Sequence, residues 1–221
     1  MKDEVEIKLR LTMPPGDAKK RIVACGARAA GLPGAQVRSD AAQLPVPASP
    51  AAASENRTRE VASRVFEDNV LYDSGGLALA RAGRLLRLRR MTTPAGTTAV
   101  LTYKEPAASE SSRYKVRGEI EVDIPDPEAF DTILRKLGYR AVYRYQKYRT
   151  TFEAGDLHVL LDETPIGNFI ELEGRPEAID DFARQLGFTS ADYILLSYRA
   201  LQEESFAGTG REPGNMVFST E

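Results

Sequence analysis

Apolar and charged residues alternate strictly over residues 4–11, near the start of the chain. Successive side chains of an extended chain point to opposite faces, so this pattern predicts a β-strand with one buried and one polar face. The polar face is unusual because it carries two acids and two bases in one row. The buried face consists of Val5, Ile7, Leu9 and Leu11, and the charged face of Glu4, Glu6, Lys8 and Arg10.

Strands with similarly charged faces are predicted in six later segments, at residues 85–90, 98–106, 114–124, 145–153, 157–163 and 169–174. We therefore expect about eight strands, which is enough for a sheet to close into a barrel. The strands follow one another and are joined by short turns, which favours antiparallel pairing with helices packed outside. The predicted fold class is α+β, with a closed eight-stranded antiparallel β-barrel.

Helices are predicted at residues 15–31, 126–138, 176–187 and 190–204. In the second of these, Asp126 is a helix N-cap, Pro127 occupies the first helical position, and Gly138 ends the helix. The third ends in the same way at Gly187, and Ser190 caps the last. Strand, short turn and helix recur in this order, as expected for helices that pack on the outside of one sheet.

Two segments lack the large apolar residues that a folded core requires. Residues 33–59 are rich in Ala, Pro and Ser, and the tail at 206–221 has a similar composition. Such segments cannot bury enough surface to offset the loss of conformational entropy. We expect a single domain at residues 1–205, a flexible insertion at about 33–59, and a disordered tail.

Composition narrows the classes of partner. The 221 residues carry a net charge of −2, so no overall basic surface favours nucleic acid. The sequence contains no long apolar run, so no membrane span is predicted. The single cysteine, Cys25, excludes an internal disulfide, and together with the absence of a signal peptide it favours the cytoplasm.

The charged faces of the predicted strands have two interpretations. Each strand taken alone fits a sheet with one face in water. Taken together, bases on five strands and acids on four favour a closed barrel with these faces inside. Clustered Arg and Lys would bind a polyanion, and clustered carboxylates would bind Mg²⁺ or Mn²⁺. The pattern therefore predicts a tunnel for a metal–polyphosphate ligand.

The motifs that carry these charges resemble those of the CYTH family, the triphosphate tunnel metalloenzymes. Glu4-x-Glu6-x-Lys8 resembles the family signature, and "LRLR", "LTYKEP", "RGEIEV", "KYRTTFE" and "LDETPIGNFIELEG" follow in family order. The resemblance covers residues 4 to about 203 except for the insertion, and it implies an eight-stranded barrel around a charged tunnel.

The resemblance also implies a role for each charged residue. Lys8, Glu4 and Glu6 would be catalytic. Metal ligands would be Glu4, Glu6, Glu119, Glu121, Asp162, Glu171 and Glu173. Triphosphate would be bound by Lys8, Arg87, Arg89, Lys104, Arg117, Lys147 and Arg149.

Several other residues receive structural roles. Arg10, Lys115, Asp123 and Glu153 share the charged faces without a motif role, and we expect them to be rim or salt-bridge residues. Four further residues are expected to have structural roles. His158 is the only histidine, and Cys25 is expected to fill an apolar helix face. Tyr198 is expected to pack the last helix, and Gly167 to form a turn.

The implied reaction is metal-dependent attack on a bound triphosphate. The resemblance leans toward class IV adenylyl cyclases, which convert ATP to cyclic AMP and pyrophosphate. Hydrolysis of tripolyphosphate, thiamine triphosphate or a nucleoside triphosphate remains an alternative, as does a non-enzymatic polyphosphate or nucleotide sensor. Either a monomer or a homodimer would accommodate such a tunnel.

Overall fold

The computed structural model describes residues 2–30, 63–107, 113–210 and 212–219, so the expected insertion at 33–59 lies outside the described residues. The strands are β1 (Lys2–Leu11), β2 (Arg28–Ala29), β3 (Arg64–Ser74), β4 (Leu85–Thr93), β5 (Gly96–Lys104), β6 (Lys115–Asp123), β7 (Tyr139–Ala154), β8 (Leu157–Thr164) and β9 (Gly167–Glu173). The helices are α1 (Pro15–Ala24), α2 (Ala78–Arg81), α3 (Pro127–Lys136), α4 (Pro176–Gln185) and α5 (Tyr198–Phe206).

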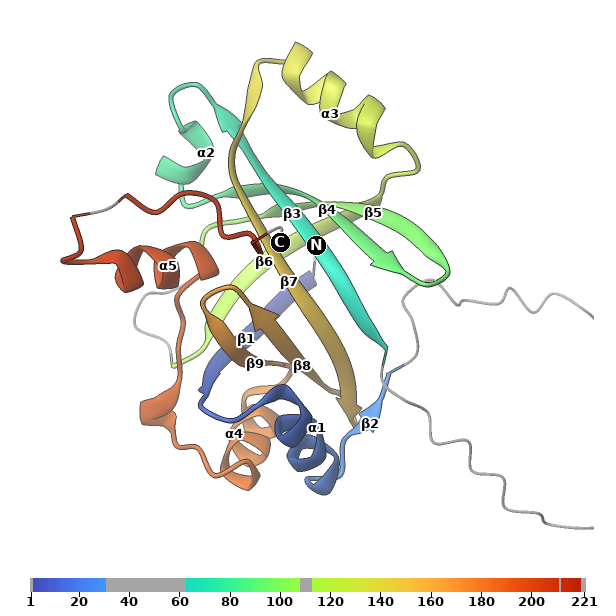
Figure 1. Cartoon of the computed structure of the whole chain (residues 1–221), viewed down its shortest axis with the longest axis vertical. Coiled ribbons are helices and arrows are strands. Elements are labelled where there is room, and N and C mark those ends of the chain that lie inside the picture. Colours follow the sequence, from blue (N-terminus) through green and yellow to red (C-terminus); the bar gives the residue numbers. More distant parts are fainter. Residues whose placement is uncertain (1, 31–62, 108–112, 211, 220–221) are drawn as a thin grey trace, which may run out of the picture.

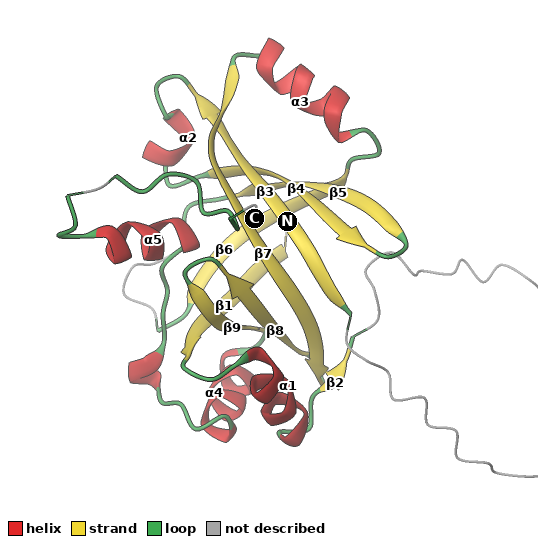
Figure 2. Cartoon of the chain, in the orientation of Figure 1, coloured by secondary structure: helices red, strands yellow, loops and turns green. Residues whose placement is uncertain are grey.

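Eight of the strands close into an antiparallel barrel, which confirms the predicted fold class (Figures 1 and 2). The hydrogen-bonded order is β7-β3-β4-β5-β6-β1-β9-β8, and β8 pairs back with β7 to complete the ring. The short strand β2 adds to β7 outside the ring through Arg28 and Ala29. β1 lies between β6 and β9, so the charged row of the first strand faces acids and bases on both neighbours.

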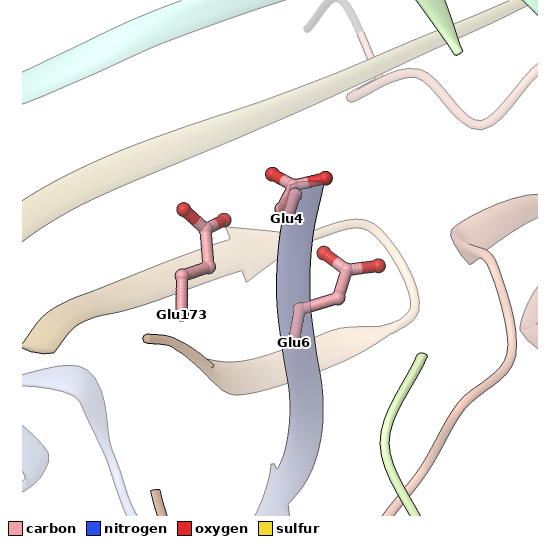
Figure 3. Close-up of side chains that lie close together, drawn as sticks. All are labelled: Glu4, Glu6 and Glu173. Carbon is pink, nitrogen blue, oxygen red and sulfur yellow. The ribbon is translucent and has the colours of Figure 1, made fainter. Parts of the chain in front are cut away.

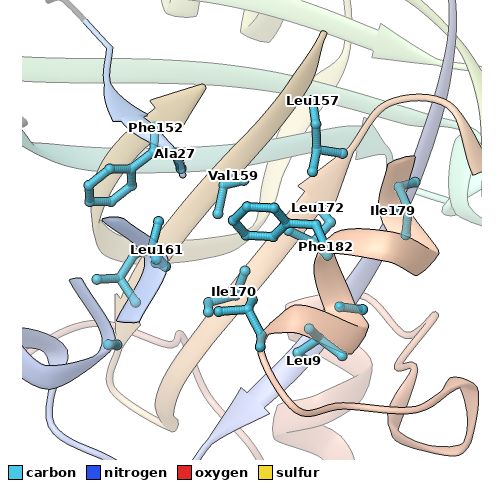
Figure 4. Packing of buried hydrophobic residues seen from close by; sticks show 14 of the residues in the cluster. Leu9, Ala27, Phe152, Leu157, Val159, Leu161, Ile170, Leu172, Ile179 and Phe182 are labelled. Atoms are coloured by element: carbon cyan, nitrogen blue, oxygen red, sulfur yellow. The ribbon is translucent and has the colours of Figure 1, made fainter. Parts of the chain in front are cut away.

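Helices cover the apolar outer face of one side of the barrel. α1 and α4 lie side by side at the bottom of Figure 1, against β8, β9 and β1. Their contacts with the sheet bury a continuous apolar cluster (Figure 4), which is the largest source of hydrophobic stabilisation in the described residues. The cluster includes Ile7, Leu9, Ile22, Phe152, Val159, Leu161, Ile170, Leu172, Ile179 and Phe182.

α3 begins and ends as its sequence predicts. The side chain of Asp126 accepts a hydrogen bond from the backbone N–H of Ala129 at 2.9 Å, which satisfies one free donor of the first turn. Pro127 follows at the first helical position. Gly138 has φ +89°, a conformation that is strained for residues with a Cβ, so the helix ends there. Leu134 then packs on Leu88 of the barrel.

The predicted helix at 15–31 is too long. α1 ends at Ala24, and Gly26 has φ +90°, which reverses the chain toward β2. The sequence pattern did not indicate this end because Ala and Arg, both good helix formers, continue beyond the glycine.

The predicted helix at 190–204 is wrong in its first half. A 3-10 turn at Ser190–Asp192 is followed by an extended stretch, in which Ile194 exchanges both backbone hydrogen bonds with Lys8 at 2.9 Å. α5 begins only after Ser197, whose hydroxyl accepts from the N–H of Ala200. The long-range pairing with β1 therefore overrides the local helical pattern.

The expected disorder of the tail is contradicted for residues 212–219. Met216 is 1% exposed and exchanges backbone hydrogen bonds with β7, donating to Arg144 and accepting from Gln146. Its side chain packs with Tyr143, Tyr145 and Leu201. Asn215 accepts from the backbone N–H of Arg144, and the backbone N–H of Phe218 donates to the side chain of Gln146. Several contacts with β7 therefore hold a segment whose average composition is typical of disorder. No helix of the described residues is long and apolar enough to cross a membrane.

Candidate functional site

A cavity of about 400 Å³ opens inside the barrel, and we call it the barrel cavity. β1, β3, β4, β5, β6, β7 and β9 contribute side chains to it, together with α2 and the start of α5. Among the described lining residues, ten are basic and seven are acidic. The charged faces predicted from the sequence therefore point inward.

The barrel cavity gathers all but one of the predicted site residues. Those that line it are Glu4, Glu6, Lys8, Arg87, Arg89, Lys104, Arg117, Glu119, Glu121, Lys147, Arg149, Glu171 and Glu173. The exception is Asp162, which is 0% exposed and is covered by the lining side chains of Lys147, Arg149 and Tyr198 that donate to it. These residues come from strands as distant in the sequence as β1 and β9. Closure of the barrel brings them together.

Three carboxylates converge at one place in the wall. Glu4 and Glu6 project from β1, and Glu173 projects from β9 toward them (Figure 3). One carboxylate oxygen from each lies within 4.8 Å of the others, a spacing that a single divalent cation could span. The spacing follows from the register, because Glu6 and Glu173 are direct neighbours across the β1–β9 ladder.

These three acids differ in their electrostatic surroundings. Burial raises the pKa of Glu173 to about 8, and the nearby Glu4 and Glu171 add to the effect although Arg149 opposes it. Burial alone would also raise the pKa of Glu6, but Lys8 and Lys115 outweigh it and lower that pKa to about 2. Without a cation the group therefore holds a proton on Glu173 at neutral pH. A carboxylate set that retains a proton because of burial and the repulsion between its members is well suited to a divalent metal.

The other predicted metal ligands lie elsewhere in the wall. Glu119 and Glu121 are neighbours on β6, where Glu119 lies 2.9 Å from the ammonium group of Lys104. Burial raises the pKa of Glu119 to about 7. Glu121 accepts from the hydroxyl of Thr102 at 2.7 Å and lies 3.5 Å from Arg87.

Asp162 and Glu171 are occupied by bases rather than grouped with the three converging acids. Lys147 donates to Asp162 at 2.7 Å, Arg149 donates to both its oxygens, and the Tyr198 hydroxyl donates to it at 2.7 Å. Glu171 is paired with Arg149 and, at 3.2 Å, with Lys8. Both acids thus hold bases in place.

The bases surround the cavity from several strands. Burial opposes the charge of Lys8, but Glu171 and Glu6 outweigh it and raise the pKa of Lys8 above its usual value. Arg87 donates to Thr102 at 2.9 Å and to the Tyr145 hydroxyl at 3.3 Å. Lys104 pairs with Glu4 and Glu119. Arg117 instead donates to the backbone carbonyls of Gly83 and Glu105, so its position fixes the loop before β4.

Three of the residues expected to have no binding role differ in how they relate to the cavity. Lys115 pairs with Glu6 and lines the cavity, which agrees with its expected role as a salt-bridge residue. Arg10 lies over the ring of Phe169 at 4.7 Å, outside the cavity lining. Tyr198 packs the start of α5, as expected, but its ring also lines the cavity, 5.5 Å from the Lys8 ammonium and 5.3 Å from that of Lys147.

Sequence reasoning missed the buried residues contributed by β3. Glu67 is 3% exposed, and Asn69, which is 0% exposed, accepts from Arg89 at 2.9 Å. The strand itself was not predicted, since Val65, Glu67, Asn69 and Leu71 mix apolar and polar side chains on the inner face. Glu67 stands between Phe66 and Asp68, so the local pattern gave no clear signal for a buried acid.

Fold and site together define an antiparallel barrel protein whose internal cavity is lined by clustered acids and bases. The chain belongs to the CYTH family, whose domain matches residues 44–198. β1, which supplies Glu4, Glu6 and Lys8, precedes the matched residues. CYTH triphosphate-tunnel enzymes are in general metal-dependent, in keeping with the three converging acids.

Individual relatives agree with this assignment. The chain is 31% identical over 150 residues to the adenylate cyclase CyaB of Aeromonas hydrophila, covering 63% of this chain and 73% of the relative. Its fold is similar to that of PH1819 of Pyrococcus horikoshii, with a TM-score of 0.66, 21% identity, and coverage of 91% of this chain and 99% of the other. It is also similar to HpAC1 of Hippeastrum, described as having a dominant triphosphatase activity, with a TM-score of 0.56, 17% identity, and coverage of 91% and 96%.

Proposed function

We propose that this protein is a metal-dependent enzyme that cleaves a bound organic triphosphate, with conversion of ATP to cyclic AMP and pyrophosphate as the favoured reaction. The observation that carries the proposal is the barrel cavity itself. Three converging carboxylates and a ring of Lys and Arg face the same 400 Å³ space. That combination neutralises a metal–polyphosphate ligand better than it serves any apolar or cationic one.

The bases bind the phosphate chain in this proposal. Arg87, Arg89 and Arg149 present forked donors that match phosphate oxygens, while Lys8 and Lys147 act as point charges. The raised pKa of Lys8 keeps its ammonium protonated, so we assign it to the phosphates and not to proton abstraction. Lys104 and Arg117 complete the basic set on the β5–β6 side.

Glu4, Glu6 and Glu173 would hold the metal, and Glu119 and Glu121 would add negative charge from β6, the strand that pairs with β1. Mg²⁺ or Mn²⁺ supplies positive charge that neutralises the phosphates and makes the attacking hydroxyl more acidic. We assign Asp162 and Glu171 to orienting Lys147, Arg149 and Lys8, because their oxygens already accept from these bases. Positioning and charge neutralisation supply most of the rate in such reactions.

An apolar wall favours an organic triphosphate. Leu71, Leu79, Val142 and Tyr143 line the same cavity as the phosphate-binding bases. Inorganic tripolyphosphate has no group to place against them, whereas a nucleoside does. In the cyclase reaction the ribose 3′-hydroxyl attacks the α-phosphorus and pyrophosphate leaves. The resemblance to CyaB supports this choice.

Hydrolysis is the second candidate. Attack of water at the terminal phosphorus needs the same bases and acids, and the activity described for HpAC1 supports it. A sensor that binds nucleotide or polyphosphate without turnover would also use the cavity, but it would not require a site for a divalent cation.

The deciding experiment is a substrate panel. ATP, thiamine triphosphate and tripolyphosphate are incubated with Mg²⁺ or Mn²⁺, and cyclic AMP, diphosphates, pyrophosphate and phosphate are resolved. We expect cyclic AMP and pyrophosphate from ATP, no turnover with EDTA, and none for Glu6→Gln. Glu163→Gln is the matched control, because Glu163 pairs with Arg64 on the outer face of the barrel. Binding of a triphosphate without any product would refute the proposal that the protein is an enzyme. Release of phosphate from ATP without cyclic AMP would refute the cyclase reaction.

A further inference from the structure

Glu67 is a buried acid beneath the bases to which phosphate binding is assigned. Its carboxylate lies 3.4 Å from Arg89 Nε, 3.6 Å from Lys147 Nζ and 3.9 Å from Arg149 Nε. Its side chain is 3% exposed and does not line the barrel cavity. Glu67 is therefore paired with the three bases at a place on the inner face that the ligand space does not reach.

Glu67 is held by charge rather than by a complete set of hydrogen bonds. Its Oε2 has no hydrogen-bond partner, although Arg89 and Lys147 lie nearby. Asp162, another buried acid that does not line the cavity, accepts hydrogen bonds from Lys147, Arg149 and Tyr198. Asp162 thus fixes the bases in position, whereas Glu67 contributes a negative charge without restricting where their donors point.

That charge opposes binding of a polyanion. Of the residues that the structure describes, ten bases and seven acids line the barrel cavity, so its wall carries an excess of positive charge that attracts phosphates. Glu67 reduces this excess at the three bases that it contacts, and it remains there when a ligand enters because it is outside the ligand space. In a low-dielectric interior one unit charge at this range changes a binding constant by about tenfold or more.

We propose that Glu67 is a fixed counter-anion that limits how tightly the barrel cavity holds polyphosphate, so that the charged product can leave after each turnover. The role rests on the proposed function, since it presupposes a triphosphate at Arg89, Lys147 and Arg149. Glu67 would act on the ligand through its charge alone, without contact with the substrate.

The test measures binding of tripolyphosphate by titration calorimetry in EDTA, and ATP turnover with Mn²⁺. Glu67→Gln keeps the shape and removes the charge, so we expect Kd to fall by about tenfold. KM and kcat should both fall, with stronger inhibition by pyrophosphate. Asp68→Asn is the matched control, because Asp68 is the next residue on β3. Arg144 donates to both of its carboxylate oxygens, at 2.8 and 2.7 Å, on the outside of the barrel. The Kd and kcat of this control should equal those of the wild type.

A structural role alone would give the opposite result. If Glu67 only held the bases in place, Glu67→Gln would bind tripolyphosphate more weakly or equally, and that outcome overturns the inference. Glu67→Asp provides a second variant in case the first does not fold, because it keeps a charge in the core but moves it away from the bases. It should bind more tightly than wild type, and equal or weaker binding again overturns the inference. Wild-type protein that neither binds tripolyphosphate nor turns over ATP would instead contradict the proposed function.

Discussion

Arg149 and Asp162 face each other across the β7–β8 ladder, and the guanidinium donates to both carboxylate oxygens, at 2.7 and 2.6 Å. Arg149 also pairs with Glu171. The bases of the barrel cavity are thus interleaved with acids and are not a cluster of unpaired like charges. This arrangement determines how each variant of the site should behave without ligand.

Arg149→Met should destabilise the protein even without substrate. Removal of the guanidinium leaves the buried negative charges of Asp162 and Glu171 without one of their positive partners. This loss should lower the free energy of unfolding by about 3–5 kcal/mol. Arg144→Met is the matched control on the same strand, because its bidentate partner Asp68 lies on the outer face and Arg144 is half exposed. It should cost about 0–1 kcal/mol. Urea denaturation measures both, and equal losses would contradict a buried ion-pair network.

Glu173 should make the metal-free protein less stable as pH rises. Its folded-state pKa of about 8 exceeds its ordinary value of 4.5, so the folded state retains a proton that the unfolded state has released. This contribution to stability is complete below about pH 4.5 and is lost as pH rises toward 8, by up to about 1.4 kcal/mol per pH unit. Glu173→Gln should remove that part of the slope, measured as melting temperature in EDTA from pH 5 to 9.

The control for this titration is Glu153→Gln, which changes an exposed carboxylate on β7. Its melting curve should follow the wild-type pH dependence. Saturating Mn²⁺ should flatten the wild-type curve, because a cation replaces the proton on the three converging acids. An identical slope in Glu173→Gln and wild type would refute the assignment to Glu173.

Tyr198→Phe should weaken both the fold and the site. It removes a hydrogen bond to buried, charged Asp162, a loss of about 1.5–3 kcal/mol. Turnover should fall as well, because Asp162 orients Lys147 and Arg149. Tyr193→Phe removes a comparable 2.8 Å hydrogen bond to Asp180 away from the cavity, and it should leave turnover intact. Equal kcat/KM in the two variants would show that Tyr198 has a packing role only.

Met216→Ala should reveal that the tail is part of the fold. Met216 is 1% exposed against Tyr143 and Tyr145, so truncation should cost about 2 kcal/mol or more of unfolding free energy. Val23→Ala is the control, since Val23 is 54% exposed, and it should cost less than about 0.5 kcal/mol. A disordered tail would make both substitutions silent in thermal and chemical denaturation.

The sequence by itself determined the faces of the strands. Alternation is a local property of extended backbone, so Glu4, Glu6 and Lys8 could be placed in one row, and their acid–base chemistry predicted a metal and a polyphosphate. The caps of α3 were equally local, since Asp126, Pro127 and Gly138 act on their own turn of helix. The resemblance of the motifs to those of CYTH proteins then implied that these strands form a barrel with the charged faces inside.

Tertiary structure alone decided which charges meet. Register across β1 and β9 places Glu173 beside Glu6, whereas the β7–β8 ladder gives Asp162 to Arg149. Ile194 leaves a helical pattern to pair with Lys8, and Met216 is buried within a polar tail. The sequence pattern could not predict the ion pairs of Glu67, because its partners come from β4 and β7. Each of these depends on contacts between residues far apart in the chain, whose free energy exceeds the local preferences that a sequence pattern records.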